Sequence, residues 1–246
     1  MKKFIIFLFI LFFSTALLSS NDFQTLLNKA NNLYQQEKYL EALSCYLDII
    51  DSGIKDSRVY YNIANTYFRL NKIGKAILFY ERAKRISPRD PDVIYNLSFL
   101  KSIVKEQQEE NPILLFFSKV YGIFSLNEIS VIFSILYFSL IILVGINIIL
   151  KSRKIKIINI GLISLVILIG IWLSSRAIKE KINKQAIVIK KQSPVYSGPG
   201  EDYTLGFSLP EGIKVDLIKK ERDWWEIGYK EKGVRGWIRK ENIEEI

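Results

Sequence analysis

Two long apolar stretches without a charge, residues 129–150 and 157–173, restrict what this chain can fold into more than any other feature. They contain 22 and 17 residues. Uncharged apolar segments of about eighteen residues or more usually cross a bilayer as helices, because the lipid core offers backbone groups no other hydrogen-bond partner. We therefore expect transmembrane helices at 128–150 and 157–175, which form a hairpin around the short loop 151–156.

The loop between the two expected spans is strongly basic. It carries four positive charges in six residues and no acidic residue. Short loops rich in lysine and arginine stay in the cytoplasm, so the hairpin is expected to turn there and to leave both its ends on the opposite side. The expected linker 176–184 opposes this orientation because it also carries four basic residues, and an inverted hairpin remains the alternative.

Residues 1–20 have the layout of a secretory signal peptide. Lys2 and Lys3 precede an apolar run, and small or polar residues follow it. An uncleaved N-terminal anchor is the alternative, and both place residue 21 onward outside the cytoplasm. With the hairpin, this predicts a multi-pass membrane protein whose soluble parts face away from the cytoplasm; in a bacterium that is the inner membrane, with the soluble parts in the periplasm or at the cell exterior.

The charge distribution and the residue types exclude several functions. The net charge is +10, but the segment 111–184 around the apolar stretches accounts for +7 of it, and the two soluble parts are close to neutral. Neither part therefore has the basic face that binding to nucleic acid requires. The chain has no histidine and a single cysteine, Cys45, which argues against a zinc site and against histidine-dependent catalysis. We expect no metal, no cofactor and no enzymatic activity.

A period of 34 residues runs through the first soluble part. It is visible in asparagines, alanines and tyrosines: Asn28, Asn62 and Asn96; Ala42 and Ala76; Tyr46 and Tyr80. This pattern resembles the tetratricopeptide repeat, whose motif falls on Tyr60, Ile63, Ala64, Tyr67, Ala76, Tyr80, Ala83 and Pro88 in the second unit. The resemblance implies two helix pairs and a capping helix, 92–105, within residues 21–111. Pro88 and Pro91 end the second pair, because proline cannot continue a helix.

In the tetratricopeptide family the first helix of each pair lines a groove for extended peptides or partner helices. On the expected register the groove positions are Asn31, Tyr34, Tyr61, Asn65, Phe68, Arg69, Tyr95 and Phe99. Aromatic rings and amides suit apolar anchoring and recognition of a peptide backbone, although Tyr61 and Tyr95 could equally pack on neighbouring helices. Leu27, Asp92 and Asn96 replace the basic residues of the family's carboxylate clamp, so a chaperone C-terminus is not the expected ligand.

Residues 112–127 lead from the repeats into the first span. The stretch 112–124 is apolar apart from Lys119 and too short to cross a bilayer, so we expect an interfacial segment, with a buried helix on the repeats as the alternative. Ser125 and Glu128 have the spacing of a capping box, which predicts that the first span begins there.

Residues 185–246 change to short β-like runs separated by turn residues. S-G-P-G at 197–200, W-x-x-I at 224–227 and G-W-I at 236–238 resemble the bacterial SH3-like (SH3b) domain, which implies a small all-β SH3-like barrel. Alternation along the strand puts Trp225 and Ile227 on the core face and Trp224 on the other face, and Trp237 is expected in the core. The candidate partner-binding residues on this domain's surface are Tyr196, Tyr203 and Trp224.

The order of these modules resembles the BatE-type proteins of bacterial aerotolerance operons. Those proteins are encoded with membrane-bound von Willebrand factor A proteins and a MoxR-type ATPase. The resemblance implies a multidomain chain of all-α repeats, a transmembrane α-helical hairpin and an all-β barrel that serves as an adaptor or scaffold within an envelope complex. A cell-wall anchor or sensor, whose SH3b-like domain holds a peptidoglycan glycopeptide, is the alternative function.

Overall fold

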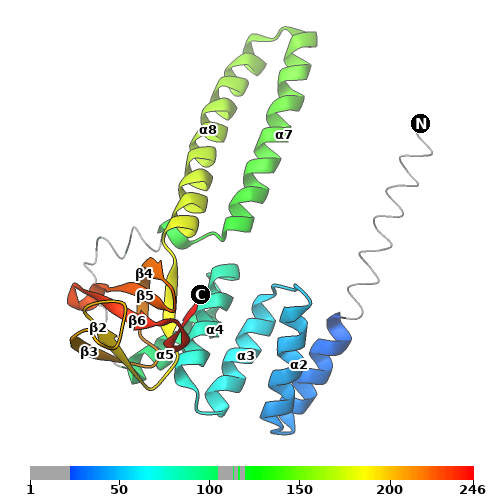
Figure 1. Ribbon diagram of the computed structural model, residues 1–246. Coiled ribbons are helices and arrows are strands. Elements are labelled where there is room, and N and C mark those ends of the chain that lie inside the picture. The colour runs from blue at the N-terminus through cyan, green and yellow to red at the C-terminus, as the bar shows by residue number, and fades with distance from the viewer. Residues whose placement is uncertain (1–22, 105–112, 114–115, 117–119) are drawn as a thin grey trace.

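The computed structural model describes residues 23–104, 113, 116 and 120–246. The expected signal peptide, and residues 112, 114, 115 and 117–119 of the expected interfacial segment, lie outside these residues. The described chain has three parts: helical repeats, a long helical hairpin and an antiparallel sheet. The hairpin stands away from the repeats and the sheet, which pack side by side (Figure 1).

The repeat part is a row of helices joined by short turns. Residues 23–35 form the first helix, followed by α2 (Tyr39–Asp51), α3 (Ser57–Arg69), α4 (Ile73–Ile86) and α5 (Pro91–Ile103). The side chains of Asp56 and Asp90 accept hydrogen bonds from the first backbone N–H groups of α3 and α5. Pro91 opens α5, where its missing N–H would have no helical partner anyway. Helix α5 lies at the position of the expected capping helix, 92–105.

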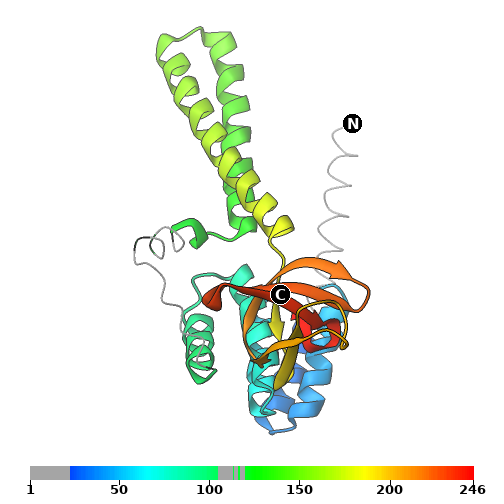
Figure 2. The ribbon, with the colours of Figure 1, turned by 60° about the vertical axis from the view of Figure 1, so that its left-hand side comes forward.

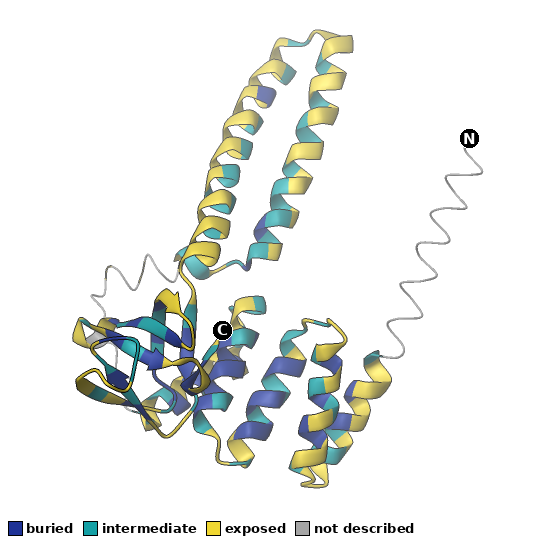
Figure 3. Ribbon diagram, in the orientation of Figure 1, coloured by how far each residue is buried: buried dark blue, intermediate teal, exposed yellow. Residues whose placement is uncertain are grey.

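Small residues lie where paired helices approach one another. Ala64 on α3 and Ala76 on α4 are both completely buried. Tyr46 and Tyr80, one period apart, are almost completely buried beside them. Figure 3 shows the buried residues concentrated between the helices of the row. The alternation of small and large side chains therefore produces the close-packed core that the sequence period predicts.

The hairpin consists of α7 (Leu126–Leu150) and α8 (Arg153–Ile182). The expected capping box is confirmed: the Glu128 N–H donates to Ser125 Oγ, and Glu128 accepts from the Ser125 backbone N–H. The two helices touch closely at Gly170, where an added Cβ would lie 3.2 Å from the Phe133 ring. Because α8 extends to Ile182, most of the expected linker 176–184 is helical.

Both hairpin helices are long and apolar enough to cross a membrane. Their apolar windows have mean hydropathies of 2.7 and 2.5, and only 6% of each window is buried within the chain. A helix in the core of a soluble protein would bury most of such a surface. These two helices instead leave their apolar side chains uncovered along most of their length (Figure 3).

The C-terminal part is a sheet of seven described strands. They are β1 (Gln185–Val188), β2 (Gln192–Tyr196), β3 (Leu205–Pro210), β4 (Lys214–Glu221), β5 (Trp224–Tyr229), β6 (Val234–Arg239) and β7 (Ile243–Glu245). All neighbours are antiparallel, and the order is β3-β2-β6-β5-β4-β1-β7. The sequence led us to expect a barrel, but the described sheet is not closed. Strands β3 and β7 are its two edges, and each pairs with a single neighbour among the described strands.

One face of the sheet is apolar and buried. Ile227 and Ile238 lie in this core, and Trp225 packs against it, as the alternation along β5 predicts. Trp237 was expected in the core, and this prediction is wrong. The residue is half-buried and pairs with Glu226 on the opposite face of the sheet. The core-facing positions of β6 are Gly236 and Ile238, since a Cβ on Gly236 would lie 2.5 Å from Val195.

The sheet covers one face of α4 (Figures 1 and 2). Strand β1 is buried on both sides: Ile187 belongs to the repeat core, whereas Ala186 and Val188 belong to the sheet core. A two-repeat array leaves an apolar helix face without a neighbouring repeat. In this chain the sheet covers that face of repeat two, together with α5.

Candidate partner-binding groove and its support

Tyrosines on the second helix of each pair donate hydrogen bonds to asparagines on the first helix, and these bonds recur with the sequence period. The Tyr46 hydroxyl donates to Asn31 Oδ1 at 2.7 Å. One period later, the Tyr80 hydroxyl donates to Asn65 Oδ1. Asn62 Nδ2 also donates to Asn31 Oδ1, at 2.9 Å. These bonds hold the side-chain amides of Asn31, Asn62 and Asn65 in one orientation. Binding a peptide would therefore cost these side chains less conformational entropy.

Burial keeps the two supporting tyrosines protonated. Removal from water raises the pKa of Tyr46 to about 12, with a smaller contribution from nearby Tyr34. Burial likewise raises the pKa of Tyr80, with a smaller contribution from Tyr61. Both hydroxyls therefore remain donors at neutral pH, so the oxygens of Asn31 and Asn65 are occupied. Their amide N–H groups are the atoms left to donate to a ligand carbonyl.

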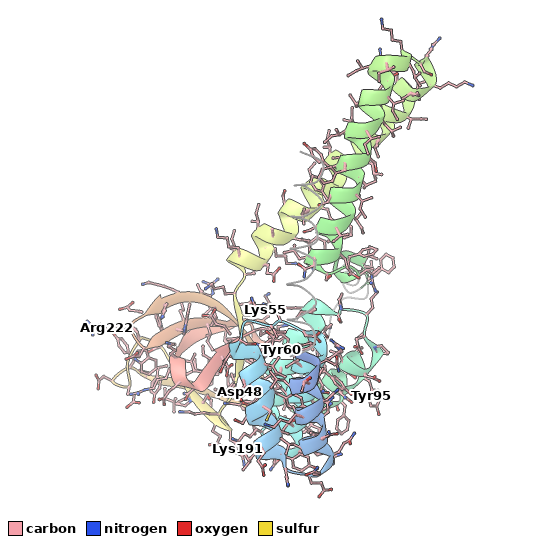
Figure 4. The ribbon with its side chains drawn as sticks, turned by 90° about the vertical axis from the view of Figure 1, so that its right-hand side faces the viewer. Asp48, Lys55, Tyr60, Tyr95, Lys191 and Arg222 are labelled. Carbon is pink, nitrogen blue, oxygen red and sulfur yellow. The ribbon has the colours of Figure 1, made fainter. Side chains whose placement is uncertain are left out.

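Three of the candidate groove residues are exposed aromatic rings on α3 and α5. Tyr95 is 70% exposed, Phe99 47% and Phe68 37%. The rings of Phe68 and Phe99 meet edge to face with centroids 6.4 Å apart. Tyr95 lies at the outer edge of the repeat part (Figure 4). Large exposed rings beside fixed amides can anchor apolar side chains of a partner.

The remaining predicted groove residues, Tyr34, Tyr61 and Arg69, contact one another or side chains of neighbouring helices. Arg69 Nε lies 3.4 Å from the Tyr34 hydroxyl, and the Tyr34 ring meets Tyr39 edge to face at 5.3 Å. The Tyr61 hydroxyl accepts from Asn96 Nδ2 at 3.1 Å. The structure therefore places all eight predicted residues on the first helices of the pairs. It brings Phe68 to Phe99, and Arg69 to Tyr34.

Four residues outside the predicted set form hydrogen bonds with the candidate groove residues. They are Asn62, Asn96, Tyr46 and Tyr80. The signal was present, since each of these residues repeats at a spacing of 34. What the period does not reveal is which side chains reach across from the second helix to the first.

The candidate residues of the C-terminal part form a second aromatic group, on the face opposite the sheet core. The rings of Tyr196 and Trp224 meet edge to face with centroids 5.5 Å apart, and the Arg239 guanidinium lies 5.5 Å above the Trp224 ring. Trp224 is consequently only 9% exposed, less than its position on the outer face led us to expect. Tyr203 is 52% exposed and covers Gly198, where an added Cβ would lie 2.3 Å from the ring.

A buried charge cluster joins the sheet to the repeats. Glu81 on α4 is 6% exposed and forms ion pairs with Lys101 on α5, at 2.8 Å, and with Lys214 on β4, at 3.1 Å. Burial alone would raise the pKa of this carboxyl. The charges of Lys214 and Lys101 outweigh burial and lower the pKa to about 2. Glu81 is therefore ionised under all ordinary conditions and ties three elements together.

Two glycines allow the backbones of the two parts to come close. A Cβ on Gly74 would lie 2.6 Å from the Val188 carbonyl oxygen, and one on Gly212 would lie 2.7 Å from Ile77. The Gly74 N–H donates to Glu211 Oε2 at 2.9 Å. Side chains larger than hydrogen would separate these surfaces. The repeats and the C-terminal part were expected to be separate domains, and no sequence pattern predicted this contact.

Comparison with protein families agrees with the repeat geometry. Residues 57–90 match the tetratricopeptide repeat model, and these residues contain α3, α4 and the turn that follows them. No curated protein matches this chain. Tetratricopeptide repeats are typically modules that bind other proteins and have no enzymatic activity, so the match supports a protein-interaction scaffold.

Proposed function

We propose that this protein is a membrane-anchored, non-enzymatic adaptor whose repeat groove binds segments of partner proteins in the bacterial envelope. The observation that carries the proposal is that the helices of the repeat part combine exposed rings, Tyr95, Phe99 and Phe68, with the oriented amides of Asn31 and Asn65. The rings would hold apolar side chains, and the amides would donate to backbone carbonyls. The neutral charge balance of the repeats favours a partner segment that is extended and largely uncharged.

Membrane insertion of the α7–α8 hairpin is part of this proposal. Its support is the uncovered apolar surface of both helices. The basic loop 151–156 at the tip favours a cytoplasmic turn. In that orientation the groove and the sheet lie on the same side, in the periplasm or outside the cell.

The C-terminal sheet completes the proposed adaptor as an SH3b-like module. Its S-G-P-G, W-x-x-I and G-W-I segments support the assignment, and their order along the chain matches that family. With the order of the modules, this favours a BatE-type role beside von Willebrand factor A membrane proteins and a MoxR-type ATPase. The contact of β1 with α4 would hold the two binding modules in a fixed relation.

A photo-crosslinking experiment in intact membranes tests the groove. A photoreactive phenylalanine analogue at Tyr95 is expected to capture specific membrane-protein partners. Phe68→Ala together with Phe99→Ala should reduce that capture by about tenfold, because both rings are exposed anchors rather than core residues. The same analogue at Ser44, exposed on α2, serves as the control. Equal capture from positions 95 and 44, or capture unaffected by the double substitution, would contradict the groove assignment.

A cell-wall function is the second candidate, because Tyr196, Trp224 and Trp237 place aromatic rings on one face of the sheet. Rings on a surface can stack on sugars, which favours binding of a glycopeptide. The full chain in detergent would then co-sediment with purified peptidoglycan, and Tyr203→Ala would weaken this more than Ile218→Ala, a change at a similarly exposed residue. Failure of the full chain to sediment would exclude this candidate and leave the adaptor proposal intact.

A further inference from the structure

Two cations converge on one aromatic ring at the base of the hairpin. The Arg176 guanidinium carbon lies 5.1 Å from the Tyr121 ring centroid, and Lys179 Nζ lies 5.0 Å from the same centroid. Arg176 also donates to the Tyr121 carbonyl oxygen. The guanidinium is therefore held in place, and the Tyr121 ring also attracts the Lys179 ammonium group.

These two cations have no acidic partner in the described chain. Residues 120–182 contain two carboxylates, and Glu128 is paired with Arg89 from the repeat part. Glu180, the other, forms no ion pair among the described residues. Two like charges beside one ring repel each other, and an anion between them would remove that repulsion. The geometry therefore points to a negatively charged ligand.

Hydroxyl groups lie beside the two cations. The Tyr121 hydroxyl and Ser175 Oγ are 3.2 Å apart. A guanidinium fork, an ammonium group and two hydroxyls are donors that together suit the oxygens of a phosphodiester. Arg176 uses one of its N–H groups on the Tyr121 carbonyl, which leaves others of its five for a ligand.

The position of this cluster along the hairpin identifies the source of the phosphodiester. It follows directly after the apolar stretch 157–173. Trp172 and Phe124 meet there edge to face with centroids 6.1 Å apart. Aromatic rings at the end of a membrane span lie at the level of the lipid headgroups. A ligand at this depth is a lipid of the bilayer itself.

We propose that Tyr121, Ser175, Arg176 and Lys179 form a binding site for the headgroup phosphate of an anionic phospholipid. This site rests on the proposed insertion of the hairpin into the membrane. A lipid bound there bridges α8 and the segment before α7, and Arg89 connects that segment to the repeats through Glu128 and the Ile123 carbonyl. The bound lipid thereby stabilises the orientation of the repeats at the membrane surface.

Native mass spectrometry of the delipidated full chain, titrated with phosphatidylglycerol, tests the site. The unmodified chain is expected to bind the lipid saturably. Arg176→Gln with Lys179→Gln should weaken binding by about tenfold or more, because two charge-assisted contacts are lost. Arg153→Gln with Lys154→Gln removes the same charge from the other end of α8 and should change the affinity by less than about twofold. Phosphatidylcholine should bind no more strongly to the unmodified chain than to the Arg176/Lys179 variant.

Several results would overturn this site. Equal losses in the two double variants would show that binding reflects net charge alone. Competition by inorganic phosphate at the concentrations of the lipid would show that the ligand is not a lipid. A variant that keeps both charges, Tyr121→Phe, should retain saturable binding with reduced affinity, and an unfolded double variant would be recognised by its melting curve.

Alkaline carbonate extraction of cell membranes separates the two proposals. Release of the chain refutes hairpin insertion, whereas retention without lipid selectivity refutes only the lipid site.

Discussion

Ala76→Trp is expected to unfold the repeat part. Ala76 is completely buried on α4 and belongs to the core that α4 shares with α3. An indole cannot fit there without separating the helices, and the cost should reach at least about 3 kcal/mol, a large part of the stability of a small domain. Far-ultraviolet circular dichroism and limited proteolysis of the full chain would show the loss of repeat helices.

The same side chain at an exposed position is the matched control. Ser44→Trp places an indole on the outer face of α2 and should leave the melting curve almost unchanged. A normal melting temperature for Ala76→Trp would show that position 76 is not at the helix–helix contact. The assignment of the 34-residue register would then be wrong.

Glu81→Leu is expected to break the attachment of the sheet to the repeats. The substitution removes the carboxylate between Lys101 and Lys214, so two partly buried ammonium groups are left facing each other. Removing one member of a buried ion cluster typically costs about 3–5 kcal/mol. We expect the full chain to melt at a lower temperature and in two steps, with the sheet and the repeats unfolding separately.

The pH dependence of this contact has a defined sign. The pKa of Glu81 is lowered from 4.5 to about 2 in the folded chain, so its contribution to stability is fully present above the unfolded value. That contribution is lost as the pH falls toward the folded value. The difference in unfolding free energy between the unmodified chain and Glu81→Gln should therefore be constant near neutral pH and shrink between about pH 4.5 and pH 2.

An apolar replacement of the whole cluster distinguishes charge from packing. Glu81→Leu combined with Lys101→Met and Lys214→Met should restore a single melting step, because well-packed apolar side chains often replace a buried ion cluster without loss. Glu41→Leu, a change at an exposed residue of α2, controls for the loss of a negative charge. A single cooperative transition in Glu81→Leu at unchanged temperature would show that the cluster does not hold the two parts together.

Several features of this fold could be predicted because they are local or periodic. The 34-residue spacing of alanines and tyrosines predicted the helix pairs, and Ala64 and Ala76 are buried as a close helix contact requires. The capping box at Ser125 and Glu128 predicted the start of α7 within one residue. Alternation along β5 placed Trp225 and Ile227 on the core side. In each case a residue's role follows from neighbours a few positions away along the chain.

The errors concern residues whose surroundings come from distant segments. Trp237 was expected in the core, but Gly236 and Ile238 occupy the core-facing positions of β6. Trp224 was expected to be open to solvent, but Tyr196 and Arg239 cover it. The alternation of residues along one strand defines its two faces but does not show which face is buried. Burial of a face depends on the neighbouring strands.

The sequence by itself determined the helical repeat, the apolar hairpin and the neutral, histidine-free character of the soluble parts, because these depend on period, length and composition. Only the tertiary structure decided that the sheet is open and that it packs on α4. That contact joins Glu81 to Lys214, 133 residues apart, and seats Ile187 in the repeat core. No spacing rule relates such residues, since their proximity results from the packing of two separately formed elements whose uncovered apolar faces fit each other.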